Sequence, residues 1–120
     1  MPVPVLVAHD DKETRDLALA ALSAAGLEAV GFEDPIAALD AIETNSRVRV
    51  LVTRVDFGSG KLNGVALARM LRVKRPGAKI LFLALPSNAH HTEGEGVFLP
   101  MPLVEPHLLV EMVSKLLVSD

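Results

Sequence analysis

Short apolar runs alternate with amphipathic helical patterns along the sequence, and this alternation constrains the fold more than any other feature. The runs are rich in β-branched residues, which is typical of buried strands, and we expect strands at residues 3–8, 27–32, 48–53, 79–85 and 97–100. Apolar residues spaced by three and four positions predict helices at about 11–25, 34–42, 63–74 and 105–118. We expect Leu17 and Ile36 to face the core on the first two helices.

An alternation of this kind predicts a parallel sheet whose strands are joined by right-handed crossovers, with helices on both faces. The interval between the last two strands breaks the rhythm. Residues 86–96 are rich in proline, glycine and polar residues and have no apolar period, so we expect a loop there, with the fourth helix short or absent. Part of the adjacent sheet face would then be uncovered, exposing some of Leu81, Phe82, Leu83, Leu85 and Val97.

The composition narrows the function. The 120 residues, which we expect to form one α/β domain over 1–120, include no cysteine, so disulfides and thiolate metal sites are excluded. The net charge is -3, lysine and arginine are scattered, and Tyr and Trp are absent, so neither a basic stripe nor a stacking platform for nucleic acid is expected. No apolar run is long enough to predict a membrane span or a signal peptide, and we expect a cytoplasmic protein.

In open parallel sheets, ligand sites lie beyond the carboxyl ends of the strands. The chemistry-bearing residues should therefore be those that follow strands one, three, four and five. These candidates are His9, Asp10 and Asp11, then Arg54 and Asp56, then Ala84, and finally Met101 and Pro102.

The segments VLVAHDD, VTRVDF with the later LNG, and MP before the last helix carry a family resemblance. Together with the order of elements, they resemble the CheY-like receiver domain of bacterial two-component response regulators over essentially the whole chain. The resemblance implies a flavodoxin-like sheet in the order 2-1-3-4-5. It also implies a site in which an acidic pair binds magnesium, an aspartate accepts phosphate, a Thr or Ser follows strand four, and a Lys-Pro pair follows strand five.

Placed on this chain, the family's functional positions are largely altered. The acidic pair falls on His9 and Asp10, and the phosphate acceptor falls on Arg54. The hydroxyl position is Ala84, and the lysine position is Met101, followed by the retained Pro102. Phe98 falls where receivers carry their switch aromatic, and we expect it to be simply packed. The resemblance therefore implies an atypical, degenerate phosphorylation pocket.

A fixed cation explains such a pocket physically. Magnesium takes about six oxygen ligands, whereas Arg54 can make charge-assisted bonds to Asp10 or Asp11 and occupy the place of the metal. We therefore expect no cofactor and no metal. A zinc site would need His9 to lie close to His90, His91 or His107, and the positions of these residues in the sequence do not favour this. For Asp10 and Asp11, helix capping is an alternative role to metal binding.

An alternative assignment makes Asp56 the phosphate acceptor, with Mg²⁺ held by Asp10, Asp11 and Asp56. That assignment would place Arg54 inside a buried strand, where an unpaired charge costs several kcal/mol.

We expect a protein that is not an enzyme. The leading hypothesis is an atypical, stand-alone receiver domain in phosphorelay signal transduction that acts by protein–protein interaction, without aspartate phosphorylation. The expected partner is a sensor histidine kinase or another signalling protein, or a second copy in a homodimer formed through residues 80–104 and the last helix. A phosphorylatable receiver remains the alternative.

Overall fold

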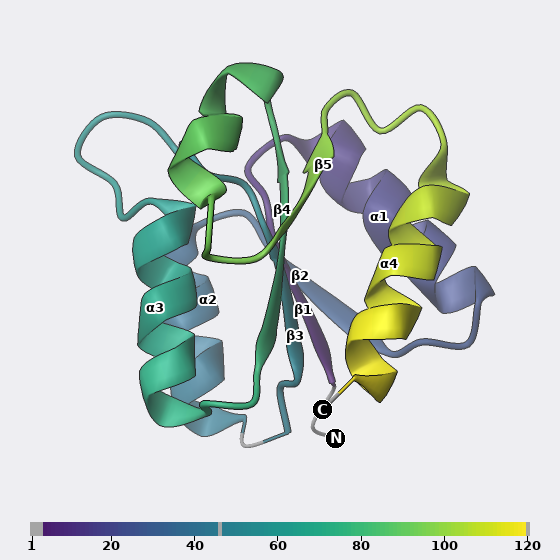
Figure 1. Ribbon diagram of the computed structural model, residues 1–120, viewed down its shortest axis with the longest axis horizontal. Coiled ribbons are helices and arrows are strands. Elements are labelled where there is room, and N and C mark those ends of the chain that lie inside the picture. The colour runs from purple at the N-terminus through teal and green to yellow at the C-terminus, as the bar shows by residue number, and fades with distance from the viewer. Residues whose placement is uncertain (1–3, 46, 120) are drawn as a thin grey trace.

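The computed structural model of the protein describes residues 4–45 and 47–119. The described residues form one parallel sheet in the order β2-β1-β3-β4-β5 (Figure 1). Its strands are β1 (Val5–Ala8), β2 (Ala29–Phe32), β3 (Val50–Thr53), β4 (Lys79–Ala84) and β5 (Val97–Pro100). The helices are α1 (Lys12–Ala24), α2 (Pro35–Thr44), α3 (Gly64–Lys74), the 3₁₀ helix η1 (Pro86–Thr92) and α4 (Pro106–Val118). The predicted class, sheet order and alternation are confirmed; residue 3 of the first predicted strand lies outside the described residues.

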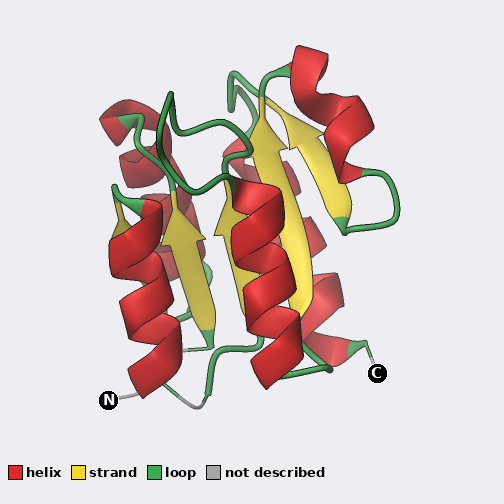
Figure 2. Ribbon diagram, turned by 90° about the vertical axis from the view of Figure 1, so that its left-hand side faces the viewer, coloured by secondary structure: helices red, strands yellow, loops and turns green. Residues whose placement is uncertain are grey.

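Helices cover both faces of the sheet. Figure 1 shows α2 and α3 on one side and α1 and α4 on the other, and Figure 2 looks onto the α2–α3 side. Successive side chains of a strand point to opposite faces, so Leu6 and Ala8 join the core under α2 and α3, whereas Val5 and Val7 join the core under α1 and α4. Burial on both faces explains why β1 and β3 read as unbroken apolar runs.

Capping residues set the helix starts that bring the chain back over the sheet. The side chain of Asp11 accepts a hydrogen bond from the Thr14 amide, and the side chain of Asn63 accepts one from the Ala66 amide. Gly26 follows α1 with a φ of +79°, a conformation that glycine adopts without strain. Across the described ranges 4–45 and 47–119, no helix is long and apolar enough to cross a bilayer.

Two expectations about the β4–β5 region need correction. Residues 86–92 are not a loop but a 3₁₀ helix, so the fourth helix is short rather than absent. Leu81, Phe82 and Leu83 are fully buried, because each packs beneath helices on its own face of the sheet. Leu85 and Val97 are exposed, so the expected exposure is confirmed for these two of the five residues.

The helix phases were also partly wrong. Leu17 is 40% exposed and Ile36 is 51% exposed. On α1 the inward positions are Thr14, Ala18 and Leu22. Leu17 and Ile36 therefore lie off the packed faces, whereas Ala18, Leu22 and Ile42, which belong to the same apolar patterns, are buried.

Candidate functional site

The carboxyl ends of β1 and β3 lie side by side and place two functional positions next to each other. Ala8 pairs with Thr53 in the parallel register, so His9 and Arg54 are the first residues beyond their strands. The Arg54 amide donates to the Ala8 carbonyl oxygen at 3.0 Å, and the His9 amide donates to the Phe32 carbonyl oxygen at 2.9 Å. Because β3 ends at Thr53, Arg54 is not buried inside the strand but lies just beyond its carboxyl end.

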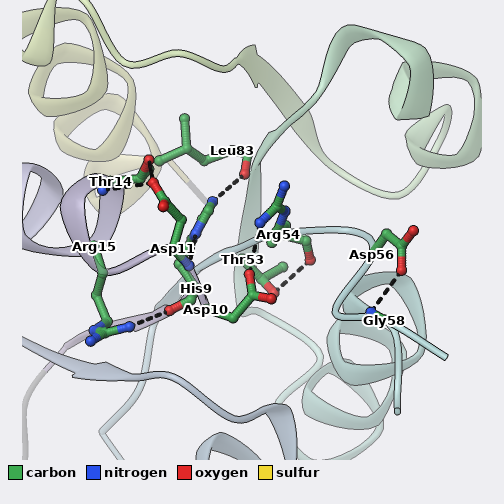
Figure 3. A network of polar contacts seen from close by, with 10 residues as sticks. All are labelled: His9, Asp10, Asp11, Thr14, Arg15, Thr53, Arg54, Asp56, Gly58 and Leu83. Carbon is green, nitrogen blue, oxygen red and sulfur yellow. Dashed lines mark hydrogen bonds and ion pairs between the residues drawn. The ribbon is translucent and has the colours of Figure 1, made fainter. Parts of the chain in front are cut away.

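Arg54 and Asp10 form an ion pair across this edge (Figure 3). One guanidinium nitrogen of Arg54 lies 2.8 Å from a carboxylate oxygen of Asp10. The Arg54 side chain is only 19% exposed, against 36% for Asp10, so the pair is partly withdrawn from water. Among the described residues, the buried Nε of Arg54 has no hydrogen-bond partner. The predicted contact between this arginine and the acidic segment is therefore present, and it uses Asp10 alone.

His9 is fully buried and is held as a neutral imidazole. Its Nδ1 accepts a hydrogen bond from the Asp11 amide at 3.2 Å, so its Nε2 carries the proton that is donated to the Leu83 carbonyl oxygen at 3.1 Å. Burial, together with the nearby positive charge of Arg54, lowers the pKa of His9 from 6.5 to about 4. This residue therefore ties the ends of β1 and β4 together without adding charge to the site.

Asp11 serves as the N-cap of α1 rather than as a partner of Arg54. Its carboxylate accepts from the Thr14 amide at 3.1 Å and also from the Thr14 hydroxyl. These hydrogen bonds, chiefly that from the hydroxyl, lower the pKa of Asp11. The segment is anchored further by Arg15, whose guanidinium donates to the His9 carbonyl oxygen at 2.8 Å. Asp11 therefore acts as a helix cap, which is one of the two roles that the sequence suggested for it.

Asp56 is exposed and points away from the ion pair (Figure 3). Its carboxylate accepts from the Gly58 amide at 2.8 Å and so closes a local turn of the β3–α3 loop. Residues 4–45 and 47–119 contain no group of three or more acidic or histidine side chains that could hold a metal ion. The three carboxylates of the alternative assignment therefore do not form one cluster: Asp10 pairs with Arg54, Asp11 caps α1 and Asp56 closes its own turn.

The last residue of β4 and the first residue after β5 carry no charged or hydroxyl side chain. Ala84 is fully buried, and its carbonyl oxygen accepts from the Met101 amide at 2.8 Å. The Met101 side chain packs against the core under α1 and α4, and its peptide bond to Pro102 is cis. Phe98 is half-buried and packs against the core under α2 and α3. Apolar packing replaces the two polar groups that the resemblance would place here.

The histidines stay apart from one another, except for one adjacent pair. The rings of His90 and His91 on η1 lie with their centroids 3.9 Å apart and are tilted by 40° to each other. His107 lies 3.6 Å from Glu105 at the start of α4. His9 has its own partners in the core, as described above.

Gly64 shapes the site, and this role was not predicted from the sequence. Its amide donates to the Val55 carbonyl oxygen at 2.8 Å, and a Cβ built on it would lie 1.8 Å from the Arg54 carbonyl oxygen. Only glycine lets the start of α3 approach the end of β3 this closely. The Asn-Gly pair at a helix start was the signal for it.

A groove of about 620 Å³ lies beside the site, between α3 and η1, and the sequence analysis did not foresee it. Its walls come from the β3–α3 loop, from the first half of α3 and from η1. The lining residues include Val55, Asp56, Asn63, Val65, Met70 and His91. The expected shortness of the fourth helix was the indication of this groove in the sequence, because a short helix leaves space beside its neighbour.

The arrangement of strand ends can now be compared with known proteins. No protein-family model matches the sequence, and neither does any curated protein. Among solved structures, the receiver domain of NtrX from Brucella abortus is similar with a TM-score of 0.85 and 22% identity, over 97% of this chain and 99% of that chain. The response regulator receiver protein from Sinorhizobium medicae WSM419 is similar with a TM-score of 0.85 and 21% identity, over 97% and 94% of the two chains. The chain has the receiver fold.

Two further structures extend the comparison. The receiver domain from the hybrid histidine kinase CckA has a TM-score of 0.77 and 26% identity, over 94% of this chain and 97% of that chain. A longer NtrX chain in complex with ADP has a TM-score of 0.84 and 23% identity, and this chain spans 27% of its length. The receiver fold predicted from the sequence is confirmed, while the roles given to the individual site residues stay predictions.

Proposed function

We propose that this chain is a receiver-type interaction module of two-component signalling that works without phosphorylation of an aspartate. The observation that supports the proposal is the ion pair between Arg54 and Asp10 at the carboxyl end of β3. A permanent guanidinium there repels a divalent cation and satisfies the carboxylate that would otherwise help to bind one. The module transmits a signal through its surface and performs no chemistry of its own.

The neighbouring residues support the same conclusion. His9 is neutral and fixed by two hydrogen bonds, so it contributes no anionic ligand. Ala84 and Met101 supply neither a hydroxyl nor a positive charge for a phosphoryl group. Asp56 closes its own turn with Gly58 and lies outside any three-ligand cluster of the described residues. In the alternative, with Asp56 as acceptor, magnesium would have to displace Arg54 from Asp10.

The partner proposed for this module is another signalling protein, a sensor histidine kinase or a second copy of this chain. Four exposed apolar side chains lie on the elements around the β5 edge of the sheet, and we call this set the β5-edge face. It comprises Leu85, Val97, Val104 and Leu108. Exposed apolar side chains of this kind offer a surface for contact with another protein.

The decisive experiment is intact-mass spectrometry after incubation with acetyl phosphate and Mg²⁺. We expect the wild-type mass to stay unchanged. A gain of one phosphoryl group that disappears in Asp56→Asn would overturn the proposal in favour of Asp56 phosphorylation. A gain that persists in Asp56→Asn would overturn it as well, because another residue would then be the acceptor.

A second variant tests the electrostatic reason for this result. Replacing Arg54 by Asp places a new carboxylate beside Asp10, and the repulsion between like charges lowers the melting temperature when magnesium is absent. We expect added Mg²⁺ to raise the melting temperature of Arg54→Asp and to leave that of the wild type unchanged. The matched control is Arg47→Asp, an exposed arginine outside this site that carries the same change in charge. Equal magnesium responses in the two variants would contradict the role given to Arg54.

A further inference from the structure

Glu95 is bound by two arginines of α3, far along the chain. One carboxylate oxygen lies 2.7 Å from Nη2 of Arg69, and the other lies 2.5 Å from Nη2 of Arg72. Nη1 of Arg72 also donates to the backbone carbonyl oxygen of Glu95 at 2.8 Å. Only 15% of the Glu95 side chain is exposed, and the two arginines, chiefly Arg69, lower the pKa of its carboxyl group to about 2. This contact stays charged over the whole physiological pH range.

The backbone around Glu95 is built to reach α3. Gly94 has a φ of +76°, and a Cβ built on Gly96 would lie 2.6 Å from the Ile80 carbonyl oxygen. The Glu95 amide donates to the Thr92 carbonyl oxygen at 2.9 Å. A tight turn between two glycines therefore follows η1 beside α3 (Figure 1), and its Glu95 carboxylate reaches the two arginines of that helix.

Little else fastens this segment to α3. Apart from Thr92, the residues of η1 are exposed or only half-buried. The groove of about 620 Å³ lies on one side of the contact, where Arg69 forms part of its wall. A second hollow of about 360 Å³, lined by Arg72 and Glu95, lies on the other. The link between α3 and the η1 end of this segment is thus a bridge of charges beside two hollows, whereas the β5 end is packed through Phe98 and Leu99.

We propose that Glu95 is a latch that holds the η1–β5 segment, residues 86–100, against α3 and thereby sets the width of the groove. With the latch closed, η1 and the edge strand β5 stay in one position. With the latch open, the η1 end of this segment becomes the least stable part of the fold, because its residues other than Thr92 are exposed or half-buried and few apolar contacts replace the lost charges. The inference does not depend on whether the module docks to a partner or accepts phosphate.

The test is hydrogen–deuterium exchange, peptide by peptide, on Glu95→Gln in the full chain. This variant keeps the shape of the side chain and removes its charge. The matched control is Glu93→Gln, which removes an exposed carboxylate two residues earlier, one that makes no ion pair among the described residues. We expect exchange across residues 86–100 to be at least tenfold faster in Glu95→Gln than in the control, with β1 and β3 unchanged.

A milder variant keeps the inference testable if Glu95→Gln folds poorly. Arg69→Gln removes only one of the two arginines that bind Glu95, and the Arg69 side chain is 64% exposed. We therefore expect a smaller acceleration of exchange in the same peptides. Equal exchange in Glu95→Gln and Glu93→Gln would overturn the latch. An acceleration spread evenly over the whole sheet would overturn it too, because the charges would then support global stability and not this segment.

Discussion

At the scale of single residues, His9 shows how an altered position can be fitted into the fold. The sequence placed it at the first position of an acidic pair but could not show that it would be fully buried and bonded to the Leu83 carbonyl oxygen. That partner comes from a strand more than seventy residues away, and residue spacing carries no information on such a contact. The Arg54–Asp10 contact, by contrast, could be predicted, because both residues follow neighbouring strands of a parallel sheet.

The buried imidazole makes stability depend on pH. The folded state holds His9 with a pKa of about 4, below its ordinary value of 6.5, so the unfolded chain binds the additional proton first as the pH falls. The stabilising contribution is complete above pH 6.5 and is lost between pH 6.5 and pH 4. A shift of this size corresponds to about 3 kcal/mol.

Urea unfolding at several pH values measures this effect. We expect His9→Asn, which has a neutral amide in place of the imidazole, to lose about 3 kcal/mol less than the wild type between pH 7 and pH 4. The variant should be the less stable protein at pH 7, where the wild-type contacts are intact. Parallel stability curves for the two proteins would contradict a buried neutral His9.

At the scale of elements, strands were easier to predict than helix faces. A strand buried on both faces needs only an apolar run, whereas a helix face depends on phase, and Leu17 and Ile36 were assigned to the wrong side. The 3₁₀ helix η1 was missed because such helices are short and have no apolar stripe to detect. Asn63 and Gly64 gave a correct helix start because capping chemistry is local.

Gly64 also provides a prediction about how α3 meets β3. We expect Gly64→Ala to destabilise the protein by about 2 kcal/mol or more, because the new methyl group would overlap the Arg54 carbonyl oxygen. Gly77→Ala is the control, since a Cβ at Gly77 meets no atom within 4 Å, and we expect its effect to stay within about 0.5 kcal/mol. Thermal or urea unfolding decides between them, and similar losses for both variants would refute the close approach.

At the scale of the whole molecule, the topology was within reach of the sequence and the surface was not. Five runs separated by helical patterns leave few arrangements once crossovers are right-handed. The expected exposure is confirmed for Leu85 and Val97 and wrong for Leu81, Phe82 and Leu83, because helices cover both faces of β4 and bury these three side chains. What remains exposed on the β5-edge face comes mostly from strand ends and the β5–α4 connection.

The β5-edge face carries the prediction about assembly. If it binds a second copy, multi-angle light scattering at high concentration gives twice the mass of one chain, and Val104→Asp returns it to the mass of one. Val104 is 77% exposed, and Val73, which is 82% exposed on α3, supplies the matched control Val73→Asp. A strict monomer at every concentration would exclude the homodimer, and dissociation by both variants alike would place the contact elsewhere.

The pairing of α1 with α4 has a consequence for biosynthesis. The two helices share one apolar layer, and Arg49, just before β3, donates to the Leu117 carbonyl oxygen near the end of α4. A nascent chain therefore cannot complete this layer until its residues up to about 118 have left the ribosomal tunnel. Folding of this domain is expected to follow translation of α4 rather than proceed strand by strand as the polypeptide emerges.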